Sequence, residues 1–173
     1  MKAEDRRVLI LEAAMEEYGR SGMHATSVEV IADRAGVSQP YIFRLFGTKN
    51  DLIVAAIEHH TTELRKAFRD AVEQRDAGSS PLEAMALAYI GFMNDDVNSL
   101  RCQLHTWAAA SDPALKDVAQ RTYREIWEDI AALSGASADE VRDFMAQGML
   151  LTILAALDLT ELFGDPLAVA KEY

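Results

Sequence analysis

The chain has 173 residues, half of them hydrophobic, and a net charge of −11. This composition is that of a globular protein, and no apolar run reaches the roughly 20 residues that span a bilayer. The first residues lack the apolar core of a secretion signal, and Cys102 is the only cysteine. We therefore expect a cytoplasmic protein with no membrane span and no intrachain disulfide.

The negative charge is unevenly distributed along the chain. Residues 1–50 hold seven basic and seven acidic residues, so the remaining 123 residues carry the whole excess of negative charge. An acidic surface repels phosphate groups, whereas a neutral one does not. We therefore expect any contact with nucleic acid to be confined to the first fifty residues.

Two helices are predicted near the N-terminus. Apolar residues recur at helical spacing over residues 5–20, and Gly22 ends this first helix. A short second helix follows, where Thr26 and Glu29 have the spacing of a capping box. Val28, Ile31, Ala32 and Ala35 form its short apolar face.

A tight turn and a third helix come next. Gly36 can adopt the left-handed conformation that ends a helix in a sharp turn. Ser38 is a suitable N-cap, and Pro40 is tolerated in the first turn of a helix that begins at Gln39. Two short helices joined by a tight turn predict a helix-turn-helix.

The rest of the chain shows only helical patterns. A long helix is predicted from Thr48 or Lys49 to about Asp76, and it joins the small N-terminal domain to the remainder. We expect an all-α fold with an N-terminal domain of residues 1–48 and a C-terminal helical domain of residues 49–173. The further predicted helices cover about 81–95, 97–110, 113–133 and 138–162.

The last predicted helix is apolar nearly all round, and its small residues lie about one turn apart. Such a helix lies either at the centre of a monomeric bundle or between two subunits. We favour a homodimer interface, because a symmetric partner supplies the second helix more easily in a chain of this size. The residues expected there are Trp127, Gly148, Thr152, Ala155, Ala156 and Leu159.

The third helix carries side chains suited to the major groove of DNA. Gln39 can hydrogen-bond adenine, Tyr41 can touch a thymine methyl or a phosphate, and Arg44 can reach guanine or a phosphate. A solvated first turn is the alternative for these three. Ile42, Leu45 and Phe46 fall at helical spacing and are expected to face the core of the domain. Phe43 is expected to pack near the junction with the long helix.

Phosphate contacts are expected beside this helix. A cation is unfavourable at the beginning of a helix on macrodipole grounds, so Lys49 suggests a phosphate nearby. The N-terminal amides of the second and fourth helices, with Thr26, Ser27, Thr48 and Lys49, offer two anion-binding ends that could straddle the groove. Thr26 is equally well explained as a cap alone.

Residues 8–57 resemble the DNA-binding domain of the TetR family of bacterial repressors. The matching elements are the helix ILEAAMEEYG, a Thr-Ser cap, IADRAGVS, an aromatic-x-x-Phe pair, Lys49 and Leu52. The resemblance implies an all-α homodimer that binds a palindromic operator and releases it when a small inducer binds. It places DNA contacts at Ser38, Gln39, Pro40, Tyr41, Phe43 and Lys49. The family commonly has tyrosine where Phe43 stands, so that hydroxyl contact to a phosphate is missing here.

The resemblance also implies that the C-terminal domain binds a small inducer, which we expect to be apolar or amphipathic. Binding would swing the long helix and change the separation of the two recognition helices, about one DNA turn or roughly 34–36 Å. Methionines and aromatics at helical spacing are more often plain core, and His105 is the most polar candidate. The candidate pocket residues are Met85, Tyr89, Phe92, Met93, His105, Trp107, Tyr123, Trp127 and Met149.

Enzymatic activity is not expected. His59 and Glu63 have the one-turn spacing of two metal ligands, and His60 is adjacent, but no third ligand follows at a recognisable spacing. No glycine-rich phosphate loop is present. We expect no metal and no cofactor. The alternative to a DNA-binding regulator is a helical dimer that senses a ligand or a partner protein without binding an operator.

Overall fold

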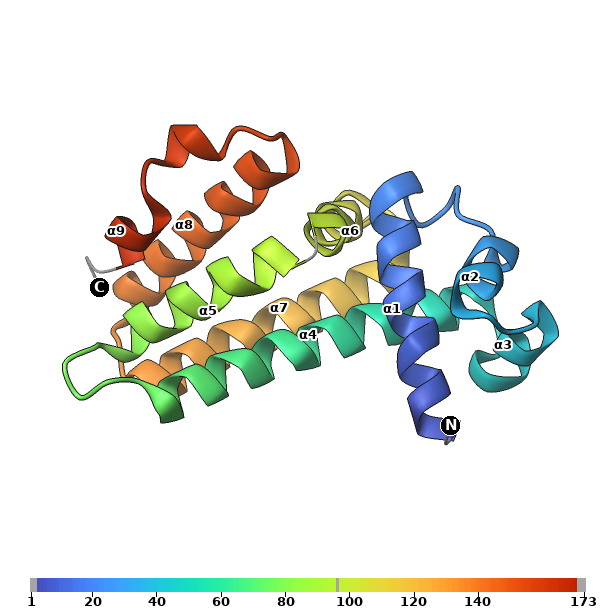
Figure 1. The fold of residues 1–173 in the computed structure, drawn as a ribbon, viewed down its shortest axis with the longest axis horizontal. Helices are drawn as coiled ribbons and strands as arrows, with labels where there is room; N and C mark the ends of the chain where they lie inside the picture. The colour runs from blue at the N-terminus through green and yellow to red at the C-terminus, as the bar shows by residue number, and fades with distance from the viewer. Residues whose placement is uncertain (1–2, 96, 171–173) are drawn as a thin grey trace. The chain divides into compact units, whose positions relative to one another are not determined.

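The computed structural model describes residues 3–95 and 97–170, so residues 1–2 and 171–173 of the two predicted domains lie outside it. Within the described residues every regular element is a helix, which confirms the all-α prediction (Figure 1). The elements are α1 (Ala3–Ser21), α2 (Val28–Ala35), α3 (Gln39–Phe46), α4 (Lys49–Gln74), α5 (Pro81–Asp95), α6 (Val97–Ala108), α7 (Pro113–Ser134), α8 (Ala138–Ala156), the 3-10 turn η1 (Thr160–Phe163) and α9 (Pro166–Ala170).

The prediction for the last long helix was wrong at its end. α8 stops at Ala156 rather than near Leu162, because Asp158 has a φ of +57° and reverses the chain. The backbone N–H of Leu159 then donates to the carbonyl of Leu154 at 2.8 Å, which satisfies the end of the helix. No glycine or proline marks this position, so the sequence pattern alone continues through it.

The chain forms two compact units. Unit 1 contains the residues up to His60 together with Asn98–Gln120, and unit 2 contains Thr61–Val97 and the residues from Arg121 onward. α4 and α7 therefore contribute to both units. The compact units do not follow the predicted boundary after residue 48, and the functional division at that point stays a prediction.

Unit 1 buries one apolar core. α2 packs on α1, and Arg34 of α2 forms ion pairs with Glu16 and Glu17 of α1. The core also takes residues from much later in the chain, supplied by α6 and the beginning of α7. Its buried members include Ile10, Leu11, Ala14, Met15, Tyr18, Val28, Ile31, Ile42, Leu52, Ile53, Cys102, Leu115 and Val118.

The backbones of α1 and α6 touch at Gly19. A β-carbon on Gly19 would lie 2.0 Å from the carbonyl oxygen of Asn98, which is far inside van der Waals contact. Beside this point the Sγ atom of Cys102 lies 3.7 Å from the Sδ atom of Met15 in the buried core. Only glycine permits this approach of the two helices.

Unit 2 is held by a core and by one ion-pair cluster. Arg65 of α4 donates two hydrogen bonds to Asp129 of α7, of 2.7 and 3.0 Å, and a third of 2.7 Å to Glu125. Arg69 adds a hydrogen bond of 2.9 Å to the same carboxylate of Asp129. These carboxylates raise the pKa of Arg65, which stays charged. The cluster fixes the second half of α4 against α7, and α5 and α8 pack over the same core.

No helix of the described residues is both long enough and apolar enough to cross a bilayer.

We predict opposite effects of alanine at two glycines. Gly19→Ala should lower the free energy of unfolding by about 3 kcal/mol, because a methyl group there collides with backbone that cannot move aside cheaply. Gly91→Ala in α5 is the control, since a β-carbon there meets no other atom of the described residues within 4 Å. Gly91→Ala should raise the free energy of unfolding by roughly 0.5–1 kcal/mol, because alanine has a higher helix propensity than glycine. Urea unfolding of both variants measures this, and equal effects would contradict the close approach at Gly19.

Candidate nucleic-acid interface and ligand cavity

The turn between α2 and α3 has the geometry of a helix-turn-helix. Gly36 lies in the left-handed region with a φ of +65°, and its N–H donates to the carbonyl of Asp33. The N–H of Val37 then donates to the carbonyl of Ala32 at 3.0 Å. Ser38 is extended and is the N-cap of α3, as predicted. Because Ile42 is buried against the core, the opposite side of α3 faces solvent.

That outer side presents a planar amide, two rings and a cation. Gln39 is exposed, Tyr41 is half-buried, and the guanidinium of Arg44 lies 5.0 Å from the centroid of the Tyr41 ring. Phe43 is 39% exposed, and its packing near the junction with α4 stays a prediction. It lies one position after the buried Ile42 on an eight-residue helix, so the two residues are on different sides of α3.

The predicted caps divide into inner and outer residues. The N-cap of α2 is Ser27, which accepts a hydrogen bond from the N–H of Val30, and not Thr26 as the capping-box spacing predicted. Thr26 is only 4% exposed, and its hydroxyl lies 2.8 Å from the carbonyl of Gly22 and 3.1 Å from that of Glu17. The hydroxyl of Ser38 makes no capping bond and is exposed. Ser38 is thus better placed than Thr26 for an outside partner.

The start of α4 carries both a cation and a carboxylate. The ammonium of Lys49 donates to the carbonyl of His24 at 2.7 Å, and burial lowers its pKa. Thr48 and Asp51 cap the helix: the Thr48 N–H donates to the Asp51 carboxylate at 3.0 Å, and the Thr48 hydroxyl donates to it at 2.6 Å. The helix N-terminus expected to receive a phosphate is therefore already occupied by Asp51, while Lys49 keeps donors for a further acceptor.

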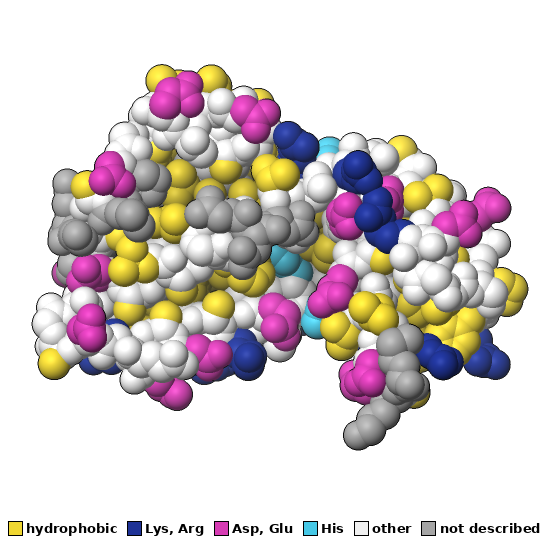
Figure 2. Space-filling model, in the orientation of Figure 1, with side chains coloured by type: hydrophobic (Ala, Val, Ile, Leu, Met, Phe, Trp, Pro, Cys, Tyr) yellow, Lys and Arg dark blue, Asp and Glu magenta, His cyan; other side chains and the backbone are white. Residues whose placement is uncertain are grey.

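A second cation lies beside α3 that the sequence did not single out. The guanidinium of Arg7 on α1 lies 4.7 Å from the centroid of the Phe46 ring on α3. Basic side chains lie next to exposed hydrophobic atoms in this part of unit 1 (Figure 2). Pro40 is exposed in the first turn of α3, between Gln39 and Tyr41. α3 therefore carries one cation of its own, Arg44, and a second cation from α1 lies over the Phe46 ring.

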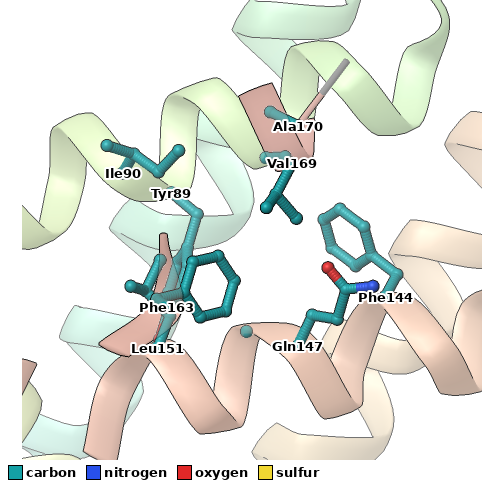
Figure 3. A pocket seen from close by; sticks show the side chains of 10 residues that line it. Tyr89, Ile90, Phe144, Gln147, Leu151, Phe163, Val169 and Ala170 are labelled. Atoms are coloured by element: carbon teal, nitrogen blue, oxygen red, sulfur yellow. The ribbon is translucent and has the colours of Figure 1, made fainter. Parts of the chain in front are cut away.

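Unit 2 contains a cavity with about 350 Å³ of unfilled space, part of it open to solvent. Side chains from α5, α8, η1 and α9 surround it (Figure 3). Its surface is almost entirely apolar, with three aromatic rings and one amide. The lining residues are Ala86, Tyr89, Ile90, Phe144, Gln147, Gly148, Leu151, Phe163, Val169 and Ala170.

Of the predicted pocket residues, only Tyr89 lines this cavity. His105 and Trp107 belong to unit 1, whereas the other candidates belong to unit 2. Met85 and Met93 are buried, and Met149 is exposed on α8. His105 is exposed, which disagrees with a polar group inside an apolar pocket, and the remaining candidates are half-buried. Burial raises the pKa of Tyr123. Gln147, Phe163, Val169 and Ala170 line the cavity but were not predicted from the sequence. The glutamine inside the apolar run FMAQGMLLTIL could have indicated a polar group in an apolar pocket.

The predicted dimer residues do not lie on one exposed face. Thr152 is buried and bonded to the Tyr89 hydroxyl, Gly148 lines the cavity, and Trp127 packs against the core of unit 2. Ala155 and Ala156 are half-buried, and Leu159 is exposed. A different set of large apolar residues is exposed, which we name the α8 stripe: Met149, Leu150, Ile153 and Leu157. Hydrophobic atoms are visible at the surface around α8 and η1 in Figure 2.

The histidines on α4 form no metal centre with other residues of the described chain. His59 and Glu63 lie one turn apart on α4, as the spacing predicted. No group of three or more histidine, cysteine, aspartate or glutamate side chains suited to a metal ion occurs in residues 3–95 and 97–170.

A helix-turn-helix with an exposed second helix, in an all-α chain, defines the class of helix-turn-helix DNA-binding regulators. Residues 10–56 match the family described as "Bacterial regulatory proteins, tetR family". The chain belongs to the TetR family of transcriptional regulators. This is a family of regulators rather than of enzymes.

Two curated relatives are transcriptional regulators. The chain is 33% identical over 98 residues to the HTH-type transcriptional activator FasR of Mycolicibacterium smegmatis, which is 57% of this chain and 45% of that protein. It is 29% identical over 130 residues to the HTH-type transcriptional regulator BetI of Escherichia coli, which is 73% of this chain and 67% of that protein. The match thus spans less than half the length of FasR.

Solved structures share the fold over nearly the whole chain. A TetR-family regulator from Rhodococcus sp. superposes with a TM-score of 0.76 at 22% identity, covering 98% of this chain and 96% of that one. The regulator FadR of Bacillus subtilis, solved in complex with stearoyl-CoA, superposes with a TM-score of 0.75 at 18% identity, covering 95% and 97%. At these identities the likeness shows the fold.

We predict that Thr26 acts on stability. Thr26→Val keeps the shape but removes the buried hydroxyl, so the carbonyls of Glu17 and Gly22 lose a donor. The free energy of unfolding should fall by about 1–3 kcal/mol. The matched variant Ser27→Ala removes an exposed cap and should cost about 1 kcal/mol. Urea unfolding measures both, and an unchanged stability of Thr26→Val would return Thr26 to the candidates for phosphate contact.

Proposed function

We propose that the protein is a ligand-responsive transcriptional repressor that binds a palindromic DNA operator as a homodimer and is released by a small-molecule inducer. The observation that carries this proposal is the outer side of α3. Gln39, Tyr41 and Arg44 stand there on a helix whose other side is buried, beside the unused hydroxyl of Ser38. A cytoplasmic location agrees with this function.

In this proposal α3 enters the major groove. The amide of Gln39 pairs with adenine, and Arg44 reaches guanine or a phosphate from its position over the Tyr41 ring. The exposed ring of Phe43 gives apolar contact to a thymine methyl or a sugar. A phosphate near Lys49 offsets the burial that lowers the pKa of this ammonium. Two copies, about one DNA turn apart, read the two halves of a palindrome.

We expect the charge of two residues to control DNA binding. Arg44→Ala and Lys49→Gln should each weaken operator binding and reduce the slope of log affinity against log salt by about 2, because each dimer loses two phosphate contacts. Glutamine at position 49 keeps a donor for the His24 carbonyl while removing the charge. The matched control is Lys66→Gln, which removes one positive charge from an exposed site in unit 2. It should leave the slope unchanged.

The operator itself is obtained by selecting bound sequences from random duplexes with the purified full chain. A palindromic motif supports the proposal and provides the DNA for the salt titrations. If no sequence is enriched and the protein is a dimer in solution, the alternative of a helical sensor without operator binding gains support. The carboxylate of Asp51 at the start of α4 and the phenylalanine at position 43 are the features that favour this alternative.

The homodimer rests on the α8 stripe. Leu150 and Ile153 lie about one turn apart on the exposed side of α8, and the exposed Leu157 is the C-cap of this helix. We therefore treat them as one apolar strip rather than as scattered surface residues. The same helix of a second copy can cover this strip in a two-fold arrangement, in which each stripe meets its own counterpart. The proposed interface thus shifts from the small residues of α8 to its large exposed ones.

We predict that a charge on the α8 stripe separates the subunits. Leu150→Lys should shift the protein from dimer to monomer, because the charge would be buried without a partner in a symmetric interface. The matched control is Leu87→Lys on α5, where the leucine is 37% exposed compared with 50% for Leu150. It should leave the dimer intact. Sedimentation equilibrium distinguishes the two states, and a dimer that tolerates lysine at position 150 would place the interface elsewhere.

The ligand response rests on the cavity in unit 2 and on the shared helices. α4 and α7 supply residues to the cores of both units, so a rearrangement of either helix in unit 2 can reach unit 1. A ligand that favours one arrangement shifts the population of the state that binds DNA. FadR of Bacillus subtilis shows that a relative with this fold binds an acyl-CoA, and FasR is an activator by name.

A further inference from the structure

The end of the described chain forms part of the wall of the cavity in unit 2. α5 and α8 contribute one part of its wall, and Phe163, Val169 and Ala170 come from η1 and α9 (Figure 3). α9 packs on α5, and η1 packs on α8. We name residues 159–170 the C-terminal strap. The strap depends on Gly164, whose φ of +84° and ψ of −151° are accessible only to glycine.

The polar groups of the cavity divide into a satisfied pair and a single open acceptor. The hydroxyls of Tyr89 and Thr152 hydrogen-bond one another, and the Thr152 hydroxyl also lies 2.8 Å from the carbonyl of Gly148. The Oε1 atom of Gln147 is buried and has no hydrogen-bond partner in the described structure. Figure 3 shows the Gln147 amide reaching from α8 toward the space between Phe163, Val169 and Phe144.

A buried acceptor without a donor is unfavourable, and the structure around it is otherwise apolar. A molecule that fills the cavity and donates one hydrogen bond to Oε1 removes that cost. None of the ten residues that line the cavity carries a charge, so an ionised carboxylate, phosphate or ammonium held against this apolar lining would have no counter-charge. The cavity therefore selects for a neutral ligand with one donor group.

We infer that this cavity binds a small, neutral, largely apolar molecule with one hydroxyl or N–H group, which donates a hydrogen bond to Oε1 of Gln147. The rings of Tyr89, Phe144 and Phe163 contact its apolar part, and the C-terminal strap covers it. The inference rests on the proposed ligand-responsive function and adds the chemical class of the ligand and the residue that selects it. A long acyl-CoA does not fit this description, because its phosphates require cations that the cavity lining lacks.

The test is a ligand titration of the full chain followed by NMR, with 4-propylphenol as the probe and propylbenzene as the same molecule without its hydroxyl. The wild-type protein should bind 4-propylphenol about tenfold more tightly than propylbenzene. Gln147→Met keeps the size of the side chain and removes the acceptor. This variant should bind the two probes with about equal affinity. The methionine side chain accepts no hydrogen bond from the probe hydroxyl, and it leaves no buried oxygen unsatisfied when propylbenzene binds.

Two further comparisons locate the site and its charge preference. Ala86→Leu fills part of the cavity and should abolish binding of both probes. Hexanoate and benzyltrimethylammonium should bind the wild-type protein about tenfold more weakly than 4-propylphenol or not at all. Thermal unfolding checks that both variants fold. The Gln147→Met comparison decides the question even when Ala86→Leu does not fold, because it compares two ligands on one folded protein.

The inference is overturned if wild type and Gln147→Met prefer 4-propylphenol equally, if a charged probe binds more tightly, or if folded Ala86→Leu binds as well as wild type. The titrations contain no DNA, so their outcome is independent of operator binding. If the protein selects an operator but Gln147→Met does not change the preference between the probes, the proposed ligand class alone is refuted. If the probe preference depends on Gln147 but the protein selects no DNA sequence, the proposed function as a DNA-binding regulator alone is refuted.

Discussion

Unit 1 depends on the contact of two helix backbones at Gly19. Because α1 approaches the carbonyl of Asn98 so closely, α6 and the beginning of α7 become part of the same core as the helix-turn-helix. Leu115 and Val118 are buried with residues that precede them by more than fifty positions. α3 is therefore supported by a larger body than the first 48 residues, and its support includes segments from the second half of the chain.

The two long helices, α4 and α7, each supply residues to the cores of both units. α4 gives Leu52 and Ile53 to the core of unit 1 and Leu64 and Phe68 to that of unit 2. In unit 2 the guanidinium of Arg65 holds α4 against α7 through hydrogen bonds to two carboxylates. A partly buried pair of this kind specifies one alignment of two helices more than it adds stability. A helix shared by two cores cannot be repacked in one of them without consequence for the other.

The sequence predicted local features and missed those made by residues far apart. Helical spacing, Gly36 and Ser38 were enough for the helix-turn-helix, and the ordered motif of residues 8–57 was enough for the family. Arg7 was missed as a neighbour of α3 because it comes from α1, far from Phe46 in the sequence. The cavity was missed because its walls join α5 and α8 to the C-terminal strap. This strap follows Asp158, a left-handed residue that no sequence pattern marks. Hydrophobic spacing cannot distinguish a lining residue from a filled core position.

The proposed operator binding and the α8 stripe support each other through electrostatics. The outer side of α3 has few cations, Asp51 places a carboxylate at the start of α4, and the rest of the chain is strongly acidic. One copy would thus gain little from phosphate contacts, which supply most of the nonspecific affinity of DNA-binding proteins. Two linked copies bind the second half-site at a high effective concentration, so a weak module becomes a selective dimer. A regulator built in this way is easily switched, because a ligand need only disturb the alignment of two modest contacts rather than displace one strong one.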